Sequence, residues 1–180
     1  MSKKLFDLFE NADFSKEVGN GDVCSIIYNK KGNSMLIQLS MEDVPESKEI
    51  FEAADIIKKR LALMSAEIYP KYPSVLFSAE RIYHIIDLLR AKPNLKGKIN
   101  GYLNNAEISE GDGIYEISLK NGGGDILSEG NIDKEIEKYA KGFFDVSIKV
   151  ILTELRPLTL TTERKKLSRT IPNCRPHLLK

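Results

Sequence analysis

In two places in this chain, a segment of alternating apolar and polar residues follows a short glycine-containing turn and a first strand-like segment, which is the pattern of a β-hairpin. The first hairpin runs from Val23 to Ser40 around a turn at 30–33. The second joins residues 106–109 to 114–119 around the turn Glu110-Gly-Asp-Gly113. Glycine and asparagine tolerate the positive φ angles of tight turns. Two hairpins so far apart in the chain predict two separate small sheets.

Amphipathic helices accompany both hairpins. After the first, Asp43-Val-Pro-Glu46 has an N-cap acceptor, a proline in the first turn and a glutamate three residues on, as in a capping box. The helix that follows has an apolar stripe at Ile50, Ala54, Ile57, Leu61 and Met64. Residues 66–73 then predict an edge strand, because Pro70 cannot donate a ladder hydrogen bond. The first unit is therefore β-β-α-β, after a short helix at 5–9.

The second unit begins with a helix from about 74 to 90, which Ala91-Lys-Pro-Asn ends. Leu95–Asn105 has no clear period. After the hairpin, a short helix around Ile126 precedes a longer one that Asn131 caps, and 145–152 forms the last strand. The order is α-β-β-α-α-β. We predict an α+β chain of two small helix-on-sheet sandwich domains, residues 1–73 and 74–152, and a basic, disordered tail at 153–180.

Charge is distributed unevenly along the chain. Residues 1–152 carry 20 basic and 24 acidic side chains, a net of −4, while 153–180 carry a net of +5. A nucleic-acid-binding domain usually has a basic surplus, so the balance of 1–152 counts against that function. The abrupt change of character at 153 also fits a chain cut or shifted away from its natural continuation. No signal peptide or membrane span is evident, and the two cysteines lie far apart, so we expect a cytoplasmic protein with free thiols.

A family resemblance rests on several strings in the second unit. They are Leu103-Asn-Asn-Ala-Glu-Ile, Tyr115-Glu-Ile-Ser-Leu-Lys-Asn-Gly-Gly-Gly-Asp-Ile-Leu, Ile132-Asp-Lys-Glu-Ile-Glu-Lys-Tyr and Phe143-Phe-Asp-Val-Ser-Ile-Lys-Val. This unit resembles the second N-terminal domain of the PolC-type alpha subunit of bacterial DNA polymerase III, a type II KH-like fold. Residues 25–72 resemble the first N-terminal domain of the same family, so the likeness covers about 20–152.

The resemblance implies a part of a replicative DNA polymerase with 3′–5′ exonuclease activity. In that family both activities belong to domains downstream of this region, and no position here matches their motifs. We therefore expect no catalytic, metal-binding or cofactor-binding residues in this chain. The resemblance implies a role in replisome assembly, with the clamp-loader tau subunit as a candidate partner. DNA contact would be weak or made by the downstream domains.

The candidate sites within the chain are weak. Lys92, Lys96 and Lys98 form the one compact basic cluster before the tail, either a DNA-facing patch or a solvated loop. A KH domain grips nucleic acid with a GXXG loop, but the corresponding junction at 127–131 has one glycine and an acidic neighbour. The Gly122-Gly-Gly124 run lacks the residues of a P-loop. His84 and His177 have no metal-ligand spacing.

Two functional hypotheses remain open from the sequence. The first is a non-catalytic N-terminal segment of a PolC-type polymerase that acts in protein interaction, using an exposed helix face or sheet edge. The second is a free-standing KH-like protein that binds nucleic acid. The sequence downstream of residue 180 in the genome would separate them.

Overall fold

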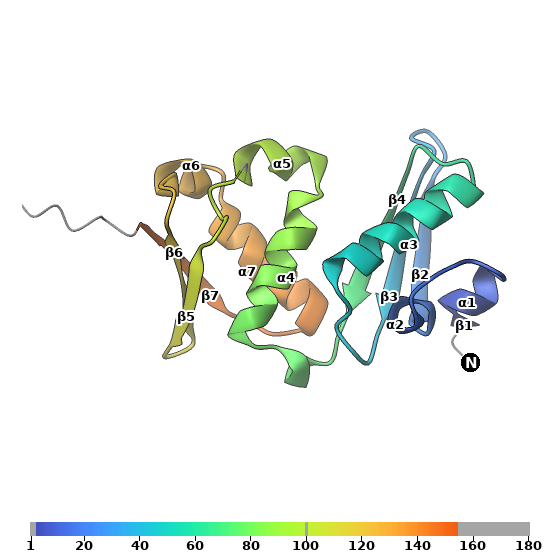
Figure 1. Cartoon of the computed structure of the whole chain (residues 1–180), viewed down its shortest axis with the longest axis horizontal. Coiled ribbons are helices and arrows are strands. Elements are labelled where there is room, and N and C mark those ends of the chain that lie inside the picture. The colour runs from blue at the N-terminus through green and yellow to red at the C-terminus, as the bar shows by residue number, and fades with distance from the viewer. Residues whose placement is uncertain (1–2, 100, 155–180) are drawn as a thin grey trace, which may run out of the picture.

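The computed structural model describes residues 3–99 and 101–154, apart from the side chain of Lys96. In this part the chain forms a four-stranded and a three-stranded sheet, each packed with helices (Figure 1). The predicted α+β class is confirmed. Both hairpins are present at the predicted places. The turn of the second one has Asp112 and Gly113 at φ 51° and 74°, the conformation that its sequence predicts.

The first sheet has the order β1-β2-β3-β4. β1 and β2 are antiparallel, as are β2 and β3, whereas β4 runs parallel to β3 after the crossover through α3. β4 is an edge strand, as Pro70 predicts. The elements of this unit are β1 (Lys3–Lys4), α1 (Leu5–Leu8), α2 (Lys16–Gly19), β2 (Asp22–Asn29), β3 (Ser34–Ser40), α3 (Ser47–Arg60) and β4 (Ser65–Lys71).

The start of α3 differs from the prediction. Its N-cap is Glu46 rather than Asp43, and the capping box pairs Glu46 with Glu49, whose carboxylate accepts a hydrogen bond of 3.2 Å from the Glu46 N–H. Pro45 explains the shift, because proline keeps the residue before it out of the helical region. The helix therefore begins after the proline instead of including it in its first turn.

The end of α3 also differs from the prediction. The helix ends at Arg60, and Ala62 has φ +50°, so Leu61 and Met64 leave the apolar stripe and are exposed. The buried stripe consists of Ile50, Ala53 and Ile57. This segment instead contacts the turn of the first hairpin. The Asn33 side chain donates a 3.0 Å hydrogen bond to the Ala62 carbonyl, and the Met64 N–H donates a 2.8 Å hydrogen bond to the Asn33 carbonyl.

The second sheet has the order β5-β6-β7, with β5 antiparallel and β7 parallel to the central strand β6. Helices α4 and α7 lie between this sheet and the first unit (Figure 1). The elements of this unit are a 3-10 helix η1 (Ser74–Leu76), α4 (Ala79–Arg90), α5 (Pro93–Ile99), β5 (Glu107–Gly111), β6 (Ile114–Leu119), α6 (Gly124–Glu129), α7 (Ile132–Phe144) and β7 (Lys149–Glu154).

Three boundaries in this unit correct the sequence prediction. The helix expected from residue 74 begins at Ala79, and a separate helix, α5, occupies part of the stretch that showed no period. Asn131 precedes α7 but has φ 53°, and its side chain makes no capping hydrogen bond. The last strand is Lys149–Glu154 instead of 145–152, because Asp145 takes a left-handed conformation that ends α7. Residues 155–180 of the expected tail lie outside the described part.

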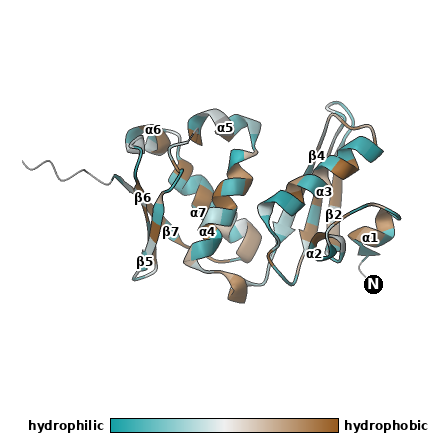
Figure 2. Ribbon diagram, viewed as in Figure 1, coloured by the Kyte–Doolittle hydropathy of each residue, from teal (hydrophilic) through white to brown (hydrophobic). Residues whose placement is uncertain are grey.

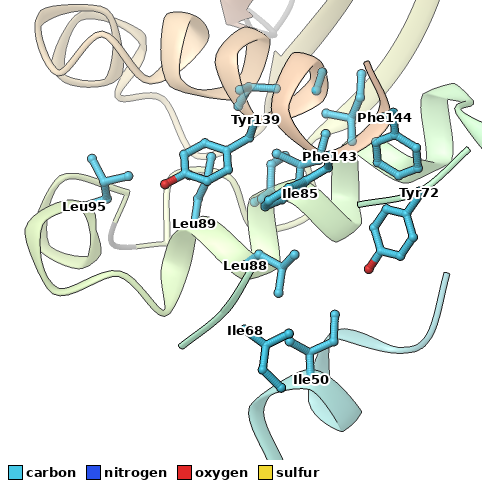
Figure 3. Packing of buried hydrophobic residues seen from close by; sticks show 14 of the residues in the cluster. Ile50, Ile68, Tyr72, Ile85, Leu88, Leu89, Leu95, Tyr139, Phe143 and Phe144 are labelled. Atoms are coloured by element: carbon cyan, nitrogen blue, oxygen red, sulfur yellow. The ribbon is translucent and has the colours of Figure 1, made fainter. Parts of the chain in front are cut away.

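An aromatic junction joins the two units. The Tyr72 ring, just after β4, lies 4.9 Å from the Phe144 ring, and the Tyr72 N–H donates a 2.6 Å hydrogen bond to the Phe143 carbonyl. The Tyr69 ring on β4 lies 4.9 Å from the Phe143 ring. On the other side of the junction, Leu88 of α4 points toward the first unit (Figure 3). The buried residues of both units therefore form one continuous hydrophobic cluster.

We predict that Phe144→Ala strongly destabilises the protein. Phe144 is fully buried and contacts Tyr72 and Phe77, with ring centroids at 4.9 and 5.3 Å. Deletion of such a ring costs about 3–5 kcal/mol. The matched control is Phe51→Ala, because Phe51 is 37% exposed, and we expect less than half that loss. Urea unfolding measures both free energies, and equal losses in the two variants would contradict the junction described here.

Candidate functional site

The outer edge of β2 is largely unpaired. β1 has two residues and pairs with Asp22 and Val23 alone. Beyond them a β-bulge at Cys24 interrupts the register with β3. Within the described chain Ser25–Asn29 have a strand partner on the β3 side alone, and Cys24 has no register partner. These six residues extend over about 20 Å at the usual rise per residue. β2 lies on the side of the sheet that faces away from the second unit (Figure 1).

Three consecutive large apolar residues on this edge are exposed. Ile26, Ile27 and Tyr28 are 45%, 58% and 52% exposed. Ile26 and Tyr28 pair with Ile37 and Met35, so they share the face of the sheet that also bears the buried Ile37, while Ile27 pairs with Leu36 and points to the opposite face. Natural edges are usually short, charged or covered, so a long apolar edge marks a place for strand addition.

Basic side chains surround the end of this edge. Lys30 and Lys31 are exposed in the hairpin turn, and Lys58 and Arg60 are exposed at the end of α3. The hydrogen bonds through Asn33 hold these two segments together. Lys59, in the same turn of α3, forms an ion pair with Asp55 at 2.5 Å, but the other four bases have no ion pair within the described part of the chain. The apolar edge therefore ends in a positive region. Figure 2 shows the brown of hydrophobic residues along β2.

Two of the three lysines in the predicted cluster, Lys92 and Lys98, have described side chains. The Lys92 ammonium pairs with Glu67 of β4 and lies 5.1 Å from the centroid of the Tyr139 ring. Burial is the largest single influence and lowers the pKa of Lys92, but the contributions of Glu67 and Tyr139 together outweigh it, so the pKa is raised and the group stays charged. Lys98 is exposed on α5, and the side chain of Lys96 on the same helix is outside the described part. The segment is a helix rather than a solvated loop.

The glycine-rich turn before α6 already holds a carboxylate. The Gly124 N–H donates a 2.7 Å hydrogen bond to Oε1 of Glu154, the last residue of β7. Gly123 has φ +87°, and a Cβ atom there would lie 2.2 Å from the Tyr102 ring, so close packing requires glycine at this position. The turn therefore joins β6 to α6.

Carboxylate side chains lie close to the junction between α6 and α7 in the folded structure. Asp133 and Glu135 lie in the first turn of α7, where they disfavour a bound phosphate. Lys98 brings one basic side chain nearby, since its Cδ atom lies 3.3 Å from the position that a Cβ atom would take on Gly130. One lysine beside two carboxylates gives little attraction for a nucleic-acid backbone.

His84 connects the two units through hydrogen bonds that the sequence did not indicate. Its Nδ1 lies 3.0 Å from Ser47 Oγ, in the first turn of α3, and its Nε2 lies 3.0 Å from the Tyr72 hydroxyl. Burial, with a smaller contribution from Arg81, lowers the pKa of His84 to about 4, and burial raises the pKa of Tyr72. Both rings are therefore neutral at pH 7. The triplet lacks the carboxylate that orients the histidine of a nucleophilic triad.

A groove of about 270 Å³ lies between α3, β4 and the start of α5. Its walls include Phe51, Ala66 and Leu88, and Lys92 and Glu67 lie at its polar side. This volume falls below the range of roughly 300–1,000 Å³ that is typical of small-molecule sites. We assign no ligand to this groove.

Comparison with known protein families, curated proteins and solved structures finds no match to this chain. Within residues 3–99 and 101–154, no helix has the length and apolar character needed to cross a bilayer. The same residues contain no group of three or more His, Cys, Asp and Glu side chains placed to hold a metal ion. The edge of β2 combines exposed apolar side chains with backbone that has no outer strand partner in the described chain.

We predict that the stability of the protein falls as the pH is lowered from 6.5 to 4. In this range the unfolded state binds a proton at His84 that the folded state, with a pKa of about 4, does not bind. At about 1.4 kcal/mol for each tenfold difference in proton affinity, and discounted for partial exposure, the loss is about 2 kcal/mol. Urea unfolding between pH 7 and 4.5 measures it. His84→Gln should flatten the curve, and an unchanged pH dependence in this variant would contradict the assignment.

Proposed function

We propose that this chain is the non-catalytic N-terminal part of a PolC-type DNA polymerase III alpha subunit and that it binds another protein during replisome assembly. One observation carries the proposal, namely the edge of β2, where six residues have no outer strand partner among residues 3–99 and 101–154 and three apolar side chains are exposed. Such an edge offers backbone hydrogen bonds and side-chain contacts to an added strand. The first partner to test is the clamp-loader tau subunit, which the family resemblance implies.

The arrangement of the second unit supports the family part of the proposal. α4, β5, β6, α6, α7 and β7 follow one another in the order α-β-β-α-α-β, which is the order of the type II KH-like fold, and α5 is an addition to it. Within this proposal the domain serves as a support. Its helices α4 and α7 cover the β4 side of the first sheet and leave the β2 side open (Figure 1).

The rival function, nucleic-acid binding by a free-standing KH-like protein, has less support. Lys92 is paired with Glu67, and the α6–α7 junction is acidic. Two features favour it, namely the position of Lys98 beside Gly130 and the exposed basic side chains at the hairpin end of β2. The net charge of residues 1–152 is slightly negative, which also counts against nucleic-acid binding.

The proposal places the chain in the bacterial cytoplasm, as part of the replisome. The polymerase and exonuclease activities of the family would belong to other domains of a full-length polypeptide. The chain itself contributes a surface rather than a reacting group.

Titration of the chain against purified tau subunit and against a single-stranded oligonucleotide tests this proposal. We expect tau to bind with a dissociation constant of roughly 1 μM or lower, about −8 kcal/mol, because strand addition combines backbone and apolar contacts. We expect the oligonucleotide to bind at least tenfold more weakly than tau at 150 mM salt. The reason is that most lysine side chains near the KH-like loop are in ion pairs or lie beside carboxylates. Tight, salt-sensitive oligonucleotide binding without tau binding would favour the rival function.

A further inference from the structure

We infer that the edge of β2 binds an extended peptide that carries alternating apolar residues and a cluster of acidic residues at one end. This inference rests on the proposed function and specifies the partner segment by its chemistry. It follows from three features that the structure brings together at one place, which are the unpaired backbone, the apolar side chains on both faces and the basic end of the hairpin.

The backbone defines the conformation of the partner. In an antiparallel edge strand, alternate residues direct their N–H and C=O groups away from the sheet. Over Cys24–Asn29 these groups have no strand opposite them in the described chain, because β1 pairs with Asp22 and Val23 alone. A partner that satisfies them must itself be extended over about five or six residues. A helix cannot satisfy them, because its own N–H groups are already bonded.

The side chains define the apolar pattern of the partner. Ile26 and Tyr28 project on one face of the sheet and Ile27 on the other. A strand added beside β2 places its residues alternately on the same two faces. Apolar side chains of the partner would therefore cover Ile27 on one face or Ile26 and Tyr28 on the other, and their burial supplies affinity.

The basic side chains at the hairpin end of β2 indicate where the partner peptide carries its acidic residues. Lys30, Lys31, Lys58 and Arg60 lie at the hairpin end of the edge without ion pairs within the described chain. At the opposite end Asp22 pairs with Lys4 at 2.9 Å, and Glu17, Glu42 and Asp43 line the same hollow, so the positive charge is confined to the hairpin end. Complementarity therefore favours Asp and Glu at the partner end that lies next to the turn.

Nucleic acid fits this edge less well, and a second copy of the chain is the occupant that the test must separate from a peptide. A single-stranded nucleic acid needs aromatic platforms for its bases, and the edge offers one exposed aromatic ring, Tyr28, beside two isoleucines. A second copy paired antiparallel along β2 would place each basic turn near the Cys24 end of the other copy, where Glu17, Glu42 and Asp43 lie close to Asp22. Both remain outcomes of the test.

The test uses selection from a display library of random twelve-residue peptides on the full 180-residue chain. We expect enrichment of peptides that alternate apolar and polar residues and carry two or more acidic residues at one end. Affinity for the best peptide should fall at least tenfold in Ile27→Lys, and the acidic preference should disappear in the double variant Lys30→Glu, Lys31→Glu. Circular dichroism checks that each variant folds, as expected for exposed positions.

Ile151→Lys is the matched control. Ile151 is 40% exposed on β7, the edge strand of the second sheet, and Glu110 and Glu116 line the same surface rather than a basic cluster. This variant should bind the peptides as the unchanged chain does. The inference is overturned if no peptide is enriched, if enriched peptides are basic or helical, or if Ile27→Lys binds them normally. It is also overturned if the edge binds an oligonucleotide, or if the chain dimerises and Ile27→Lys abolishes the dimer.

A titration of tau against Ile27→Lys separates this inference from the proposed function. If tau binds the unchanged chain and Ile27→Lys equally, the proposed function stands and the edge is not the site. If acidic peptides bind at the edge but tau does not bind the chain, the inference stands and the replisome assignment fails.

Discussion

The packing of Phe143 and Phe144 against Tyr69 and Tyr72 determines which parts of the first sheet are covered. β4 is an edge strand, and the aromatic junction brings α7 against it, with His84 adding hydrogen bonds to Tyr72 and to the start of α3. The two sheets thus share one continuous core (Figure 3). Because the second unit occupies the β4 side, the first sheet has one long edge left for a partner, and that edge is β2.

Local signals in the sequence were sufficient for most elements of the fold. Both hairpins, the longer helices and the α+β class follow from periodicity and turn residues, which act over a few neighbours. The predicted boundaries of α3 and β7 were wrong by a few residues. Pro45 moves the start of α3 to a later residue, and the left-handed conformation of Asp145 moves the start of β7 in the same direction. Two features were missed because they depend on residues distant in the chain. β1 is stabilised by pairing with β2, and the link through His84 joins residues 37 positions apart.

The candidate site was harder to predict than the fold. Lys92 looked like part of a basic patch, but its partner Glu67 lies on a strand 25 positions earlier. The run Ile26-Ile27-Tyr28 did carry a signal, because consecutive apolar residues break the alternation of a half-buried strand and place apolar groups on both faces. Whether such a strand lies at the centre or the edge of a sheet depends on strand order, which no local pattern specifies. The sequence anticipated use of a sheet edge in general terms and did not identify which one.

Hydrogen exchange at the amides of β2 tests the central claim most directly, because it reads the backbone rather than the effect of a substitution. Alternate amides between Cys24 and Asn29 have no strand partner on their outer side and should exchange fast in the isolated chain. On addition of tau, the account predicts that these amides become protected while those of β7 stay unchanged. Protection confined to α5 or to the α6–α7 junction, with β2 unaffected, would contradict it.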